Sequence, residues 1–229
     1  MSLQVFKTIL LLITTSTLLI AQTYDQLKMQ NQFEGYYGNK VRNTKISNER
    51  LGSEYLMEEW QPATVQLKDG EVKFDRAKIN IHDGTLEVIY KGQEKFISGR
   101  YIQYFDMYYQ GKTRRYIPAD AFKENGKALR GFLEVIKEDI PAVYVYHHTY
   151  LRKPNPHANI TGGYTVDRLL KKSENYIYDG ENLHKINNKK TLKQLFTSRK
   201  TEIDNIIKKN SIDVEKADDL AFLLNTLKN

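Results

Sequence analysis

The segment 143–151 is the part of the chain whose residue types and spacing point most directly to chemistry. Ring-bearing residues occupy every second position in it: Tyr144, Tyr146, His148 and Tyr150. Successive side chains of a β-strand point to opposite faces, so a strand here would place these four residues on one face. A row of tyrosine rings with hydroxyl groups at its edge could bind a glycan or a protein partner. The alternative is that the row covers a half-buried sheet face, because tyrosine is common in strands.

Three histidines near this segment raise the question of a metal site. Metal binding needs two or three imidazoles that converge on one point. His147 and His148 are neighbours on the expected strand and point to opposite faces, so at most one of them can join His157. No acidic residue lies between Lys153 and Val166 to complete a ligand set. We therefore expect no metal site.

Other residues suited to acid–base or anion chemistry are weak candidates. Glu58 and Glu59 precede Trp60, but the two carboxylates of a glycosidase face each other across the substrate, which chain neighbours rarely do. We interpret both as solvated and Trp60 as a core residue. Arg114 and Arg115 could form an anion site or a solvated strand edge. The chain has no Gly-x-Ser-x-Gly, His-Glu-x-x-His or phosphate-loop motif, so we expect a non-catalytic protein with no cofactor.

The first 21 residues have the pattern of a cleavable secretory signal peptide. Lys7 is the only charge before an uncharged, mostly apolar run over 8–20, and the small residue Ala21 ends this run. The run is shorter than the about 20 apolar residues that a membrane-spanning helix needs. Leu19 occupies a position where a small residue is usual, and an uncleaved membrane anchor is the alternative. We expect cleavage after Ala21 and a periplasmic or extracellular product that is not an integral membrane protein.

The composition excludes several classes of protein. There is no cysteine, which rules out disulfides, thiolate metal sites and a lipid anchor on cysteine. The net charge is +7, but no block of five or more basic residues is present, so we expect no nucleic-acid partner. A modest positive charge instead favours contact with anionic polymers of the cell envelope. Tyrosine is abundant, with 16 residues against one tryptophan, and this favours a β-rich body.

Alternating apolar residues predict an antiparallel β-meander over 60–187, after an irregular lead-in over 22–59. Asp69-Gly70 and Asp83-Gly84 each separate two alternating runs, which is the strongest short-range signal of a hairpin. Near the end of the meander we expect a last hairpin with short strands over 176–178 and 183–186.

The apolar pattern also predicts an irregularity inside the second strand. Apolar positions change parity between Phe74 and Ala77. A one-residue slip inverts every side chain of a strand, so we expect a bulge near Asp75 and Arg76.

From residue 188 the apolar period changes from two towards 3.6, which predicts helices. Apolar residues at helical spacing form three groups; they are Leu192, Leu195 and Phe196, then Ile203, Ile206 and Ile207, then Val214, Ala217, Leu220, Ala221, Leu224 and Leu227. We therefore expect an α+β fold: an antiparallel meander, forming a curled sheet or partial barrel, with a small helical subdomain over 188–229.

Several short segments resemble a group of exported proteins of Gram-negative bacteria for which no activity is known. The shared segments are Gly52-Ser53-Glu54-Tyr55-Leu56, Glu59-Trp60-Gln61-Pro62, Leu195-Phe196, Ile206-Ile207-Lys208-Lys209-Asn210 and Asp218-Asp219-Leu220. The resemblance implies export, a β-rich body and a helical tail, and it includes no catalytic motif.

The leading hypothesis is an exported, non-catalytic envelope or secreted protein that binds a glycan or a protein through the tyrosine-rich face. One alternative is a hydrolase that acts on envelope polymers. The other is a structural adaptor that docks a partner through its helical tail.

Overall fold

The computed structural model describes residues 37–39, 50–124, 126–153 and 166–228. The chain divides into two units, Met1–Tyr37 and Gly38–Asn229, and the description below concerns the second. The expected signal peptide over 1–21, most of the lead-in over 22–59 and His157 lie outside the described residues. Within the described part of the chain, no helix has the length and apolar character needed to span a bilayer.

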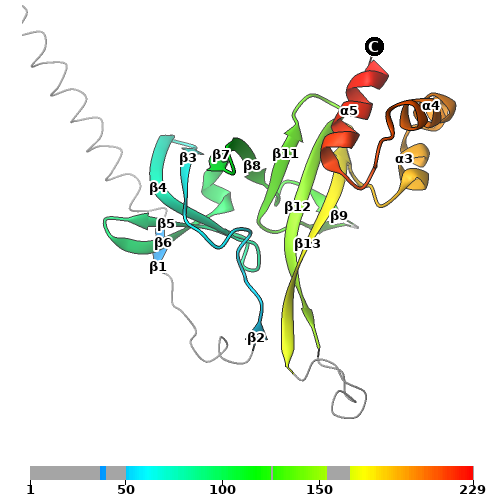
Figure 1. Ribbon diagram of the computed structural model, residues 1–229. Coiled ribbons are helices and arrows are strands. Elements are labelled where there is room, and N and C mark those ends of the chain that lie inside the picture. The colour runs from blue at the N-terminus through cyan, green and yellow to red at the C-terminus, as the bar shows by residue number, and fades with distance from the viewer. Residues whose placement is uncertain (1–36, 40–49, 125, 154–165, 229) are drawn as a thin grey trace, which may run out of the picture. The chain divides into compact units, whose positions relative to one another are not determined.

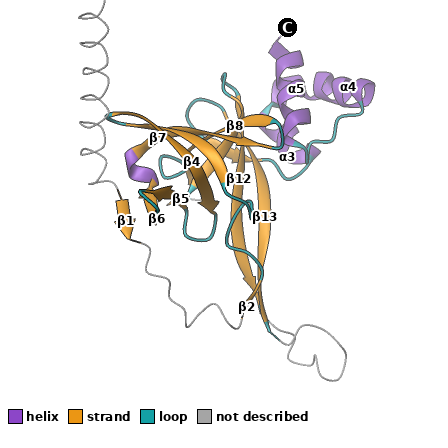
Figure 2. Cartoon of the chain, turned by 60° about the vertical axis from the view of Figure 1, so that its left-hand side comes forward, coloured by secondary structure: helices purple, strands orange, loops and turns teal. Residues whose placement is uncertain are grey.

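The body is one mainly antiparallel sheet, and the fold class is α+β with a β-meander, as expected (Figures 1 and 2). The strands are β1 (Tyr37–Asn39), β2 (Arg50–Leu51), β3 (Gln61–Leu67), β4 (Gly70–Asn80), β5 (Thr85–Tyr90), β6 (Gln93–Ser98), β7 (Ile102–Tyr109), β8 (Lys112–Pro118), β11 (Phe132–Lys137), β12 (Ala142–Arg152), β13 (Asp167–Tyr178) and β14 (Leu183–Lys185). Their order is β1-β6-β5-β4-β3-β7-β8-β11-β12-β13-β14, and β2 pairs in parallel with β13. A separate small ladder joins β9 (Lys123–Glu124) and β10 (Lys127–Ala128).

The turns and the bulge follow the sequence pattern. The two Asp-Gly pairs lie at the β3–β4 and β4–β5 turns, and each pair of strands is antiparallel. In the β3–β4 ladder, Gln61 pairs with Ala77 and Ala63 pairs with Phe74, so β4 has one extra residue between them. That residue lies at Asp75–Arg76, which confirms the predicted bulge.

The last hairpin differs from the expectation. Strand β13 begins at Asp167 and not near residue 176, because it pairs with β12 along the whole length of that strand. Residues 171–174 are polar or charged and have no apolar alternation, so the sequence pattern gave no sign of a strand there. Pairing with a long partner overrode the local pattern.

Three α-helices follow the sheet: α3 (Lys189–Leu195), α4 (Lys200–Asn210) and α5 (Ala217–Lys228). Figure 2 shows them gathered beside one end of β12 and β13. Their apolar side chains form one buried cluster with Val143 and Ile177, which point to that face of the sheet. The helical tail is therefore fixed by burial against the meander.

The opposite face of the same strands has its own cluster. Leu133, Ala142 and Tyr144 pack there with Ala119 and Leu129, which come from the segment between β8 and β11. This segment includes the β9–β10 hairpin, so the sheet is covered on both faces near β14. The two coverings position the candidate site.

Candidate functional site

Strand β14 lies at the end of the strand order, and β13 is its only partner in the sheet among the described residues. The backbone N–H of Ile186 donates to the carbonyl of Asn175 at 2.8 Å. In an antiparallel pair such bonds alternate, so His184 also directs its backbone groups to β13. The N–H and C=O groups of Leu183 and Lys185 therefore point away from the sheet, towards its open edge.

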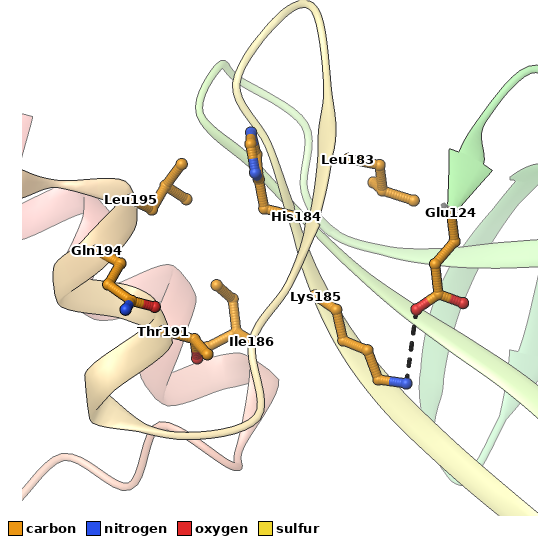
Figure 3. A pocket seen from close by; sticks show the side chains of 8 residues that line it. All are labelled: Glu124, Leu183, His184, Lys185, Ile186, Thr191, Gln194 and Leu195. Atoms are coloured by element: carbon orange, nitrogen blue, oxygen red, sulfur yellow. Dashed lines mark ion pairs between the residues drawn. The ribbon is translucent and has the colours of Figure 1, made fainter. Parts of the chain in front are cut away.

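A cavity of about 540 Å³ follows this edge (Figure 3). We call it the β14 groove. Its lining residues come from β9, from β14 and the residue after it, and from α3; they are Glu124, Leu183, His184, Lys185, Ile186, Thr191, Gln194 and Leu195. Figure 3 shows α3 on one side of β14 and Glu124 on the other. The groove thus has a strand edge between two walls.

The α3 wall is built by a short, well-capped helix. The side chain of Asn188 accepts from the Thr191 N–H at 3.0 Å, and the Thr191 hydroxyl lies 3.2 Å from the Asn188 N–H. This capping box satisfies backbone donors at the start of the helix. Thr191, Gln194 and Leu195 are three and four residues apart, so they share one face of α3 and line the groove together.

The β9 wall carries an ion-pair network. Lys185 Nζ lies 2.7 Å from Glu174 and 3.6 Å from Glu124. Burial raises the pKa of the Glu174 carboxyl, but hydrogen bonds from Lys172 and Lys185 outweigh it and lower this pKa to about 2. Glu174 is therefore ionised at neutral pH, and this wall presents fixed charges of both signs.

At the turn before β14, an acidic side chain orients a histidine of the groove. The Asp179 carboxylate accepts from the backbone N–H groups of Asn182 and Glu181, and it lies 2.7 Å from His184 Nε2. These bonds, the backbone ones first, lower the pKa of Asp179 to about 2. The ionised carboxylate holds the His184 imidazole beside the groove.

The structure places the tyrosine row on one face of β12, as the alternation predicts. Tyr144 is only 8% exposed and packs against Phe122 and Tyr178, with ring centroids 5.6 and 6.4 Å away. Tyr144 therefore belongs to the core, and the accessible part of the row begins beyond it.

The accessible part consists of Tyr146, His148 and Tyr150. The ring of Tyr146 stacks on His148 at 5.1 Å, and its hydroxyl donates to the Arg130 carbonyl at 2.9 Å. Burial lowers the pKa of His148, which favours a neutral imidazole. Tyr150 is 46% exposed and lies on the part of β12 that extends beyond β11. This end of the row is an aromatic surface.

A chain of polar side chains crosses the other face of β12. Glu134 Oε1 accepts from Arg114 at 2.8 Å, and Glu134 Oε2 lies 2.8 Å from His147 Nε2. The second ring nitrogen, His147 Nδ1, lies 2.8 Å from Ser173 Oγ. The sequence analysis missed Glu134 and Ser173, because only the pairing of β11, β12 and β13 brings them to His147.

The remaining sequence candidates have structural partners. Arg115 makes two 2.8 Å hydrogen bonds to Asp106, so its charge is already paired. Glu58 is solvated and forms an ion pair with Lys171, while Trp60 is half-buried and lies outside the core that we expected it to fill. Within the described ranges, no group of three or more His, Asp or Glu residues is arranged to hold a metal ion.

Comparisons with known proteins add no relative. No protein-family model, no curated protein and no solved structure matches the chain. The function must therefore be argued from the geometry of the sites.

Proposed function

We propose that the protein is an exported binding module that takes an extended segment of an envelope or secreted protein into the β14 groove. The observation that supports this is the outward direction of the Leu183 and Lys185 backbone groups along a walled cavity. Binding there needs no bond to be made or broken.

A polypeptide strand fits this edge better than other ligands. A strand offers N–H and C=O groups to one side at every second residue, a repeat of about 7 Å, which is the repeat of Leu183 and Lys185. Strand addition to a sheet edge uses main-chain hydrogen bonds for affinity and flanking pockets for specificity. Open edges are otherwise blunted or covered in natural proteins.

The two walls set different preferences for the side chains of the bound strand. Residues that point to α3 meet Ile186 and Leu195, which favour apolar side chains, beside the polar Thr191 and Gln194. Residues that point to β9 meet the ion pair of Lys185 and Glu124. We therefore expect a segment that alternates apolar and polar or charged residues.

Selection of displayed random peptides on the purified protein, followed by titration of the selected peptides, tests the proposal. Leu183→Pro removes an edge N–H that does not pair with β13, so the hydrogen bonds between β13 and β14 are kept. Gln194→Trp fills the groove, and Lys209→Trp, on the exposed side of α4, is the matched control. We expect at least tenfold weaker binding for the first two variants only. Selection of no peptide, or equal binding by all variants, would reject the groove as the site.

Export is part of the proposal and has its own test. The uncharged run over 8–20 and Ala21 support processing after residue 21. Mass spectrometry of protein recovered from outside the cytoplasm is expected to give a chain that begins at Gln22. A full-length product retained in the cytoplasm would contradict export without bearing on the groove.

A second candidate is glycan binding at the aromatic surface of Tyr146, His148 and Tyr150. The exposed ring of Tyr150 favours it, since aromatic faces stack on sugar rings. Thermal-shift measurements with cell-wall and polysaccharide fragments test it, because a ligand that binds only the folded state raises its melting temperature. A shift that survives Tyr146→Ala and Tyr150→Ala would reject this surface.

A further inference from the structure

A hydrogen-bonded chain connects the interior of the sheet to its surface on the face opposite the tyrosine row. Glu134 on β11 is 4% exposed, His147 on β12 is mostly buried, and Ser173 on β13 is exposed. Both links, from Glu134 to His147 and from His147 to Ser173, are 2.8 Å long. Each link uses a different nitrogen of the imidazole.

The charge of Glu134 fixes where the protons lie. Burial raises the pKa of this carboxyl, but its contacts with His147 and Arg114 outweigh burial and lower it. An ionised carboxylate only accepts hydrogen bonds, so His147 Nε2 must carry its hydrogen. In a neutral imidazole, Nδ1 is then an acceptor, and the Ser173 hydroxyl donates to it.

We propose that Ser173 is a nucleophile towards small activated esters, with His147 as its general base and Glu134 as the residue that positions the imidazole. The arrangement of acid, imidazole and hydroxyl has the roles of a serine-hydrolase triad, with the two ring nitrogens exchanged. This activity goes beyond the proposed peptide binding, because Ser173 is not one of the residues that line the β14 groove.

Hydrolysis of an ester at Ser173 needs water as its only other reactant. Ser173 Oγ attacks the ester carbonyl carbon while its proton passes to His147 Nδ1. The bond to the alcohol oxygen then breaks, and His147 returns the proton to the leaving alcohol. Water attacks the acyl-serine through the same base, which releases the carboxylic acid and restores Ser173.

The surroundings of Ser173 favour access by a small ester. The hydroxyl lies on an exposed position of β13, so the acyl group arrives directly from solvent.

The same face offers an internal control. His82 Nδ1 lies 2.8 Å from the hydroxyl of Thr149, which is on β12 two residues from His147. Among the described residues, no carboxylate accepts a hydrogen bond from this imidazole to orient it. The Thr149 hydroxyl should therefore react no faster than an ordinary surface hydroxyl.

Labelling with a fluorophosphonate, read by intact mass and peptide mapping, tests the proposal. We expect one covalent adduct at Ser173, none in Ser173→Ala, and unchanged labelling in His82→Ala. Loss of the general base in His147→Ala should slow labelling roughly 100-fold or more, and added imidazole should restore part of the rate. Hydrolysis of p-nitrophenyl acetate should fall in parallel.

Glu134→Gln tests the positioning role. An amide can donate as well as accept, so the tautomer of His147 is no longer fixed. Long-range ¹H–¹⁵N spectra should show the Nε2–H tautomer in the parent protein and a mixture in the variant, with slower labelling. Thermal melts of every variant establish folding, and His147→Gln replaces His147→Ala if the latter does not fold. The proposal would be overturned if no adduct forms or if the adduct forms at another residue. Equal labelling of the parent protein and of His147→Gln would also overturn it.

Discussion

The backbones of Gly84 and Gly131 are in contact, although they belong to different halves of the meander. A Cβ atom placed on Gly84 would lie 2.8 Å from the backbone nitrogen of Gly131. Gly84 ends the β4–β5 turn with a φ of +70°, and Gly131 precedes β11 with a φ of +86°. The lack of a side chain at both positions lets the turn approach the start of β11.

Gly84→Ala is expected to destabilise the fold through this contact as well as through its backbone. A non-glycine residue in the left-handed region costs about 1–2 kcal/mol. Gly92→Ala is the matched control, because its φ is +75° and no atom lies within 4 Å of the added Cβ. Urea unfolding should show the larger loss for Gly84→Ala. Equal losses in the two variants would mean that the contact is unimportant.

Removing a buried side chain of the helical tail should destabilise the whole protein. Leu220 is fully buried in the cluster that α5 forms with Val143 and Ile177. Leu220→Ala is expected to cost about 2–5 kcal/mol in urea unfolding. Phe222→Ala, at a 50% exposed position of the same helix, should cost less than about 0.5 kcal/mol. A loss of similar size in both variants would contradict the docking of α5.

The two ends of the tyrosine row should respond differently to truncation. Tyr144 packs in the core, so Tyr144→Ala is expected to cost about 3 kcal/mol or more of unfolding free energy. Tyr150→Ala, at the exposed end, should change stability by less than about 0.5 kcal/mol. Thermal and urea unfolding measure both. A destabilised Tyr150→Ala would show that this end of the row is structural.

The Glu174 ion pairs should make stability depend on acid. Its folded pKa of about 2 lies below the ordinary value of 4.5, so its stabilisation is fully present above 4.5. That stabilisation is lost as the pH falls from 4.5 towards 2. Glu174→Gln should therefore flatten the fall in unfolding free energy between neutral pH and about pH 3. Glu181→Gln, at an exposed position, is the control, and an unchanged slope in Glu174→Gln would contradict the assignment.

Features set by neighbouring residues could be predicted from the sequence. The Asp83-Gly84 turn, the bulge at Asp75–Arg76 and the shared face of Tyr144 and Tyr150 all follow from local conformation and from the two-residue period of a strand. The apolar spacing of the tail likewise indicated helices before their positions were known.

Features set by strand order and register could not be predicted in this way. Whether Tyr144 or Tyr150 is exposed depends on the segment that covers the sheet, and the β14 groove exists because β9 and α3 flank the same edge. Glu134 and Ser173 meet His147 only through the pairing of three strands. The sequence by itself determined the local elements and their faces. The tertiary structure decided which side chains meet, because contacts across strands depend on residues far apart in the chain.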